Sequence, residues 1–350
     1  MNRREFVGST LTLCGRLLLP AGILTAGGCT QSADSKSRGI KGTTMGTYYR
    51  VTVDSGLQAE EVAELRRGID SVFERIIGGM STYDKSSTVS RLNSANDSAW
   101  HAIGTDLLQV LREAERVSVL TGGAFDATVG PLVNLWGFGA DQHTPRIPDQ
   151  HSIASALART GYRLVALNDA PVEVKKGHPE AYVDLSAIAK GFAVDEVGRY
   201  LEVHGVREYL VDIGGDLRAG GLKGNGNPWR IAIETPDPEG RGVQRIVDVS
   251  TTGVATSGDY RNFFERDGRR YCHTLDPRTG RPVTHNLASV TVLNPSVMTA
   301  DALATGLMVM GPHAGFELAE AHAIPALFIT RENVGLRERY TSVFTPYLTG

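Results

Sequence analysis

The sequence predicts an α+β fold, in which mixed sheets are covered by packed helices. Stretches typical of strands and stretches typical of helices follow one another without the regular alternation that a doubly wound parallel sheet requires. Of the 350 residues, 41% are hydrophobic and 21% are charged, which is ordinary for a globular protein with one large or two modest domains. The 40 glycines predict many tight turns or close approaches of the backbone to a ligand.

The individual elements follow from the spacing of apolar residues. Strands are expected where apolar or β-branched residues alternate with polar ones. These stretches are 47–53, 182–184, 209–213, 229–234, 243–249, 288–293, 326–330 and 340–344. Helices are expected where apolar residues recur every three or four positions. These stretches are 59–77, 105–120, 152–158, 299–310 and 316–322.

The first 29 residues have the character of an export signal. Arg3 and Arg4 form a twin-arginine pair, and the aromatic Phe6 follows two positions later. The apolar stretch 17–26 is too short for a membrane-spanning helix. The leader therefore predicts export of the chain by the twin-arginine route.

Small residues precede Cys29, as at a lipoprotein cleavage site, although an incidental cysteine at an ordinary cleavage site is the alternative. We expect a lipid anchor at Cys29 on the periplasmic face of a bacterial membrane. A flexible polar tether at 30–40 and one folded domain at 41–350 would follow. Cys14 would leave with the leader, so Cys272 would have no partner for a disulfide.

Charge and motifs exclude several function classes. The formal net charge is −3, and the chain has no clustered basic stripe, which argues against a nucleic acid as the main partner. Zinc-type Cys/His spacing, a Walker loop, a Gly-x-Gly-x-x-Gly fingerprint and a Gly-x-Ser-x-Gly elbow are all missing from the sequence.

The stretch 183–192 is the most informative local pattern. It predicts the end of a strand, a polar turn and a helix that runs to about Tyr200. Ser186 is a suitable N-cap, and Asp184 lies just ahead of the positive end of the helix. Such an end attracts anions, and Lys190 would add a positive charge one turn later. The turn is built either for a phosphate, or for a metal that bridges phosphates, or simply as a capped helix with a solvated lysine.

A second pattern lies in the late helix. Asp301 and Thr305 are four positions apart, so their oxygens project from one helix face. A carboxylate and a hydroxyl in this arrangement suit Mg²⁺, which takes few protein ligands and keeps water and phosphate oxygens in its shell. The alternative is that Asp301 only stabilises the first turn of the helix and that Thr305 packs in the core.

Three further side chains have both a functional and a structural interpretation. His273 is a candidate general base because its ordinary pKa lies near neutrality, or it is a buried histidine beside the Asp276–Pro277 turn. Tyr83 either stacks on a flat ring or is an ordinary aromatic at a rim. Met45 is either a soft wall for an apolar ring or part of the core.

Eight segments in chain order resemble one family, the FAD:protein FMN transferases or ApbE family. They are 42–47, 80–83, 123–126 with 130–132, 183–186, 190–191, 212–216, 273–280 and 300–305. Each is short, but together they span nearly the whole chain after the leader. The resemblance implies mixed, largely antiparallel sheets in an ApbE-like, T-fold-like arrangement, with an FAD cleft between sheet and helix layers.

The resemblance also implies an activity. A member of this family would bind FAD with Mg²⁺, split its pyrophosphate and attach the FMN half to a Thr or Ser hydroxyl of an acceptor flavoprotein. The bond formed is a phosphoester, AMP leaves, and the expected acceptor is an exported protein of an electron-transfer complex. An FAD pyrophosphatase that releases FMN and AMP, or a lipoprotein that binds FAD without turnover, are the alternatives.

Site residues are carried over position by position. The resemblance implies FAD contacts at Met45, Tyr83, Ala124, Phe125, Asp126, Asp184, Lys190 and Leu275. It implies metal ligands at the Ala187 carbonyl, Asp301 and Thr305. The family often has a second acidic residue where this chain has Ala304, and some members carry an acid at the position of Lys190.

The chemistry assigns roles to Lys190, His273 and Asp276. Lys190, together with Mg²⁺, would neutralise the pyrophosphate and stabilise the leaving AMP. His273 is the preferred base for the acceptor hydroxyl, and Asp276 or another nearby carboxylate is the alternative.

Overall fold

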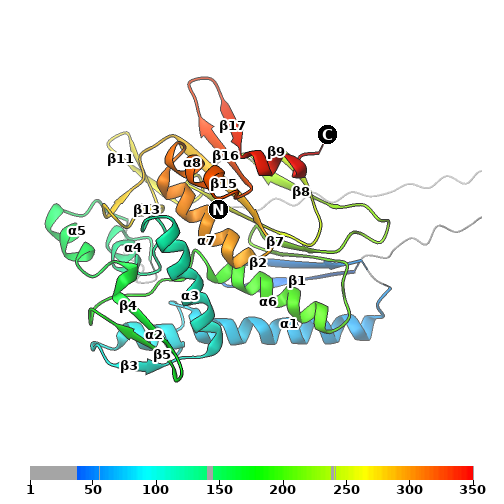
Figure 1. The fold of residues 1–350 in the computed structure, drawn as a ribbon, viewed down its shortest axis with the longest axis horizontal. Coiled ribbons are helices and arrows are strands. Elements are labelled where there is room, and N and C mark those ends of the chain that lie inside the picture. The colour runs from blue at the N-terminus through cyan, green and yellow to red at the C-terminus, as the bar shows by residue number, and fades with distance from the viewer. Residues whose placement is uncertain (1–37, 55, 140–144, 238–239, 241, 350) are drawn as a thin grey trace, which may run out of the picture. The chain divides into compact units, whose positions relative to one another are not determined.

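An eight-stranded antiparallel sheet forms the centre of the fold (Figure 1). Its strand order is β1-β2-β6-β7-β10-β15-β16-β17, so strands from both ends of the chain meet in one sheet. The strands are β1 (Arg38–Thr44), β2 (Thr47–Val53), β6 (Tyr209–Ile213), β7 (Asp216–Gly220), β10 (Gly253–Gly258), β15 (Leu287–Asn294), β16 (Ala326–Arg331) and β17 (Leu336–Tyr340).

The computed structural model describes residues 38–54, 56–139, 145–237, 240 and 242–349. The predicted leader, including Arg3, Arg4 and Cys29, and the tether up to residue 37 lie outside these residues. Strand β1 begins at Arg38, so the last residues of the segment expected as a tether pair with β2 instead. None of the helices in the described ranges is long and apolar enough to cross a membrane.

Two layers of helices lie on one face of the sheet. The inner helices, α6 (Ala189–Val203) and α7 (Val297–Met310), contact each other and the central strands. The outer helices α1 (Ala59–Met80) and α3 (Thr105–Leu120) pack on α6 and α7, respectively. The inner helices are buried around most of their circumference because they lie between the sheet and the outer helices. The outer helices bury a single apolar stripe, because their other side is not covered.

The strands bury both faces because their side chains alternate. In β16, Phe328 belongs to the core beneath the helices, while its neighbours Leu327 and Ile329 belong to a second core on the opposite face. That second core is closed by the hairpin of β8 (Trp229–Glu234) and β9 (Val243–Val249).

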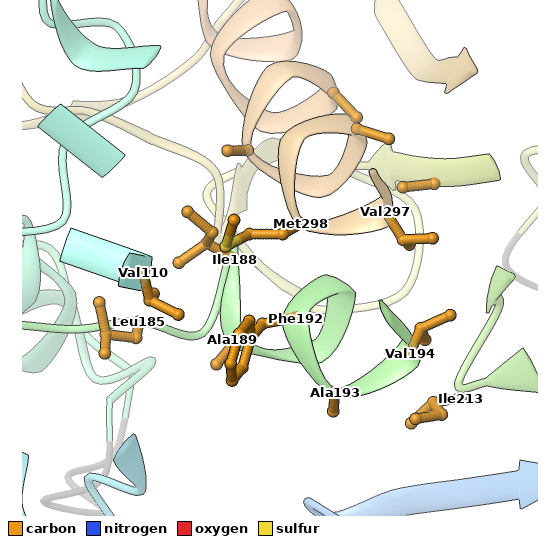
Figure 2. Packing of buried hydrophobic residues seen from close by; sticks show 14 of the residues in the cluster. Val110, Leu185, Ile188, Ala189, Phe192, Ala193, Val194, Ile213, Val297 and Met298 are labelled. Atoms are coloured by element: carbon orange, nitrogen blue, oxygen red, sulfur yellow. The ribbon is translucent and has the colours of Figure 1, made fainter. Parts of the chain in front are cut away.

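The contact between α6 and α7 is the part of the core that positions the site. Figure 2 shows Phe192 and Val194 projecting from α6, and Val297 and Met298 at the end of α7 that crosses it. All four side chains belong to one buried cluster, and Phe192 is only 1% exposed. The two helices therefore hold a fixed spacing through their buried side chains.

Smaller elements complete the fold. A three-stranded sheet, β3-β5-β4, consists of β3 (Trp100–Ala102), β4 (Val165–Asp169) and β5 (Val172–Lys176). The remaining helices are α2 (Thr88–Ser94), α4 (Gly130–Trp136), α5 (Gln150–Leu157), α8 (Ala314–Ala321) and the short 3₁₀ helices η1 (Tyr162–Leu164) and η2 (Ser342–Tyr347). Two short hairpins are β11 (Phe263–Arg266) with β12 (Arg269–Cys272), and β13 (Leu275–Asp276) with β14 (Arg281–Pro282).

Three sequence predictions differ from the structure. Residues 182–184 are extended but pair in no sheet, and 340–344 leave strand β17 at Tyr340 to enter η2. Ser186 is not the N-cap of α6, because this helix begins at Ala189 after a turn over 186–188. The reason is that the Ser186 N–H bonds to the Asp184 carboxylate, which makes a separate turn ahead of the helix.

Candidate functional site

A cavity of about 360 Å³ opens where the start of α6, the middle of α7 and the end of β10 meet the segments 124–126 and 273–277. Ten of the residues expected at the site line it. These are Ala124, Phe125, Asp126, Asp184, Ala187, Lys190, His273, Leu275, Asp301 and Thr305. Segments that lie more than 170 residues apart in the chain thus contribute to one wall.

Lys190 contributes a positive charge to the cavity wall. Its ammonium forms an ion pair with the carboxylate of Asp216, the first residue of β7, which is 2% exposed. Burial alone would lower the pKa of Lys190, but the charges of Asp216 and Asp301 outweigh it and raise that pKa above its usual value. The ammonium therefore stays charged at neutral pH and presents a fixed positive charge to the cavity.

Asp301 is the buried carboxylate opposite this lysine. It is 5% exposed, and one of its oxygens accepts a hydrogen bond of 3.1 Å from the Gly191 N–H. Burial raises the pKa of Asp301 to about 7, and the attraction of Lys190 opposes that increase. One turn later on α7, the hydroxyl of Thr305 lies 2.8 Å from the hydroxyl of Ser257 in β10.

The turn at 184–188 is held in place from both sides. The Asp184 N–H donates to the Ala127 carbonyl at 2.7 Å, and the Asp184 carboxylate accepts from the Ser186 N–H at 2.9 Å. The side-chain amide of Asn93 donates to the Val183 carbonyl at 2.8 Å and accepts from its N–H at 2.7 Å. Asn93 thereby replaces the strand partner that this extended segment lacks.

Asp126 stabilises a turn rather than presenting a free carboxylate to the cavity. One of its oxygens accepts from the N–H and hydroxyl of Thr128 at 2.7 and 2.6 Å, and the other accepts from the Tyr162 N–H at 2.7 Å. Burial raises the pKa of Asp126, and these hydrogen bonds oppose the shift. The carboxylate fixes the 124–128 segment that forms one wall.

His273 is half-buried at the other side of the cavity. Its Nδ1 lies 3.1 Å from the carbonyl oxygen of Asn262, and its ring meets Phe138 edge-on at a centroid distance of 6.5 Å. Burial lowers the pKa of His273, so the ring is neutral at pH 7. Because a carbonyl only accepts, Nδ1 of the neutral ring carries the proton and Nε2 keeps a lone pair.

Comparison with known proteins decides the family. The ApbE family model matches residues 45–328. The chain is 44% identical to the FAD:protein FMN transferase of Vibrio cholerae, over 95% of this chain and 98% of that protein. It is 39% identical to the FAD:protein FMN transferase of Escherichia coli, over 88% of each. The chain belongs to the ApbE family.

Solved structures of the ApbE family agree with this fold. The flavin transferase ApbE from Vibrio cholerae has a TM-score of 0.82 and covers 89% of this chain and 99% of its own. The Pseudomonas stutzeri flavinyl transferase ApbE, in its apo form, also has a TM-score of 0.82, with 40% identity over 90% and 98% of the two chains. The predicted α+β class and the predicted family are both confirmed.

Three of the expected site residues do not line the cavity. They are Met45 and Tyr83, which the resemblance implied as FAD contacts, and Asp276, the alternative base. Met45 occupies the β1–β2 turn with a positive φ of 49°, and its side chain packs against the main core. Tyr83 is 69% exposed in the loop before α2. The carboxylate of Asp276 makes two hydrogen bonds to the Arg278 guanidinium, at 2.8 and 2.9 Å. The guanidinium of Arg278 therefore occupies both carboxylate oxygens of Asp276.

The oxygen donors of this ApbE chain suit a hard cation. No group of three His, Cys, Asp or Glu side chains that could hold a metal gathers among residues 38–349 as described. Asp301 and Thr305 line the cavity together with Ala187, whose carbonyl would complete a set of three oxygens. Ala304 is fully buried in the main core and has no place in this set. A few hard oxygen donors, with room for water and phosphate, fit Mg²⁺.

Proposed function

We propose that this chain is an FAD:protein FMN transferase. The observation that carries the proposal is the shared cavity, in which Lys190 of α6 lies beside Asp301 and Thr305 of α7. Lys190 and a cation held by Asp301 and Thr305 would together supply the positive charge that a dinucleotide pyrophosphate requires. The names of the relatives, at up to 44% identity over nearly the full chain, support the same activity.

The proposal includes Mg²⁺, held by the carboxylate of Asp301, the hydroxyl of Thr305 and the carbonyl of Ala187. When bound, this ion supplies positive charge that makes the pyrophosphate open to attack. Lys190 supplies a second positive charge from the protein itself, and its ion pair with Asp216 fixes the direction of its side chain.

His273 acts as the general base for the acceptor. Its neutral ring accepts the proton of a Thr or Ser hydroxyl at Nε2, while Nδ1–H stays bonded to the Asn262 carbonyl. The acceptor oxygen forms a bond to the phosphorus on the FMN side, and the bond from that phosphorus to the bridging oxygen breaks. AMP leaves with the bridging oxygen, so no oxidant or reductant is needed.

A single incubation tests this function against its alternatives. The pure protein is mixed with FAD, Mg²⁺ and a candidate acceptor domain that contains a Thr or Ser. Flavin fluorescence on the acceptor after denaturing electrophoresis is the expected result. Free FMN and AMP without a labelled acceptor would identify a pyrophosphatase instead, and unchanged bound FAD would identify a binding protein.

We further propose that the chain acts outside the cytoplasm. The Arg3–Arg4 pair supports twin-arginine export, and the small residues before Cys29 support lipid attachment on the periplasmic face of a bacterial membrane. The acceptor would then be an exported flavoprotein of an electron-transfer complex. Replacement of both arginines by lysine should retain the protein in the cytoplasm, and unchanged export would contradict the proposal.

A further inference from the structure

A buried carboxylate on α6 caps the first turn of α7. Asp195 is 5% exposed and accepts hydrogen bonds from the N–H groups of Val297 and Met298, both at 3.0 Å. The hydroxyl of Ser296 also donates to Asp195, at 2.8 Å. The first N–H groups of a helix have no partner within it, so a carboxylate from another helix both satisfies them and interacts favourably with the helix dipole.

Asp195 is itself held from the sheet. The guanidinium of Arg218, on β7, donates to Asp195 at 2.9 Å and to the hydroxyl of Tyr209 at 3.0 Å. This cation compensates the buried negative charge, and it connects the two helices to the central strands. The position of the α7 start is therefore set by groups from α6 and β7 together.

The same two helices meet again one turn along each. Gly191 lies four positions before Asp195, and Asp301 lies four positions after Val297, so each pair shares a helix face. Gly191 donates its N–H to Asp301, and a Cβ on Gly191 would come within 2.4 Å of the Val297 carbonyl oxygen. Two contacts one turn apart fix both the distance between the helices and their relative register.

We propose that Asp195 is a positioning residue for the metal site, through its hold on the start of α7. The inference rests on the proposed function, because Asp301 and Thr305 are the metal ligands there. Asp195 does not line the cavity. Loss of its contacts frees the first turn of α7 to shift against α6, which moves Asp301 and Thr305 away from Ala187 and Lys190.

The test compares two neighbouring buried carboxylates on α6. Asp195→Asn removes the charge that holds α7. Glu196→Gln removes the charge of a carboxylate that is similarly buried, with the residue 8% exposed. The ion-pair partners of Glu196 are Arg75 on α1 and Arg199 on α6. Both variants lose an ion-paired carboxylate, but only Asp195→Asn loses contacts with α7. If Asp195 had a purely structural role, both variants would lose stability and neither would lose metal affinity.

Metal binding is measured on the full chain without acceptor, by titration of Mn²⁺ followed by electron paramagnetic resonance. The Mg²⁺ concentration that half-saturates FMN transfer is measured in parallel. We expect Asp195→Asn to raise the Mn²⁺ dissociation constant and the half-saturating Mg²⁺ concentration by roughly 10-fold or more, as for the loss of an outer partner of a metal ligand. Transfer should recover at high Mg²⁺. Glu196→Gln should leave both values unchanged.

Unchanged metal affinity in folded Asp195→Asn, or an equal loss in Glu196→Gln, would overturn the proposal. If Asp195→Asn does not fold, Ser296→Ala decides, because it removes one donor to Asp195 and keeps the charge. We then expect a smaller weakening of Mn²⁺ binding than in Asp195→Asn. Unchanged Mn²⁺ binding in Ser296→Ala would refute the inference. Since Mn²⁺ binding needs no acceptor, a wild-type chain that binds the metal but transfers no FMN would contradict the function and not this role.

Discussion

The N–H of Gly191 donates a 3.1 Å hydrogen bond to the carboxylate of Asp301, across 110 positions of sequence. This bond joins the helix that carries Lys190 to the helix that carries Asp301 and Thr305. The two helices approach so closely here that only glycine fits at position 191. A larger residue would force them apart at the point where their charged groups must converge.

Gly191→Ala should destabilise the fold. The added Cβ would lie 2.4 Å from the Val297 carbonyl oxygen and 2.8 Å from the Met298 Cα, and both are backbone atoms that cannot rotate away. We expect a loss of about 1–3 kcal/mol in the free energy of unfolding, measured by urea denaturation. The matched control is Gly78→Ala in α1, where no atom lies within 4 Å and alanine should stabilise the helix by up to about 1 kcal/mol. Equal effects in the two variants would contradict the close contact.

Lys190→Met should reduce both transfer and stability. It removes one positive charge from the cavity wall and leaves the carboxylate of Asp216 buried without its partner. The expected loss in unfolding free energy is about 1–3 kcal/mol, less than for a fully buried pair because the lysine side chain is 32% exposed. In the double variant Lys190→Met/Asp216→Asn, stability should partly return while transfer stays low. Full transfer in either variant would show that Lys190 has no part in the reaction.

Thr305→Val should weaken the binding of Mg²⁺ without disturbing the fold. Valine keeps the shape of the side chain but lacks the hydroxyl that faces Ser257 and the proposed metal. We expect the Mg²⁺ concentration for half-maximal transfer to rise by at least about 10-fold. Thr160→Val is the control, because it also removes one bonded hydroxyl, which donates to the Ala156 carbonyl, and neither residue lines the cavity. The same Mg²⁺ dependence in both variants would exclude Thr305 as a ligand.

The pH dependence of transfer should report His273. Burial lowers the pKa of this ring below its usual 6.5. The ring therefore stays neutral, and able to act as a base, when the pH falls from 7 to about 6.5. At saturating Mg²⁺, transfer should hold from neutrality down to about pH 6.5 and fall only below it. His273→Ala should still bind FAD but lose about 100-fold or more of its transfer rate, whereas His322→Ala, on the exposed end of α8, should lose none.

The same histidine affects stability with a defined sign. A ring whose pKa is lower in the folded chain than in the unfolded chain binds protons more weakly when folded. Acidification below about pH 6.5 therefore favours unfolding, and this share of the loss should be missing in His273→Ala. A transfer profile that falls off well above pH 6.5 would contradict the assignment of His273 as the base.

Periodicity predicted the long elements and failed on short or polar ones. Strands 209–213 and 229–234 and the helix 105–120 have the predicted bounds, because their apolar residues repeat at the strand or helix period throughout. Strand β1, Arg38–Thr44, contains two glycines and only one buried apolar side chain, Ile40, so its membership of the sheet depends on pairing with β2. Such pairing leaves no pattern in the strand itself.

The site was predictable where its residues carry a family motif and not where they act through the main chain. The spacing of Asp301 and Thr305 made them candidates only, and the resemblance implied their place in the site. Asn93 and Asp195 could not be found, because their partners are backbone groups of segments 90 and more than 100 positions away. Asp216 appeared in a motif, but its ion pair with Lys190 needs the three-dimensional fold.

Asp301→Asn tests the central claim most directly. The variant keeps the size of the side chain and an oxygen that can accept from Gly191, but it removes the charge that would bind the ion. Mg²⁺ is titrated into wild type and variant with FAD and acceptor, and FMN on the acceptor is followed by mass. The account predicts Mg²⁺-dependent labelling in wild type and a loss of roughly 100-fold or more in the variant across the titration. Equal labelling of the acceptor by both proteins at every Mg²⁺ concentration would contradict it.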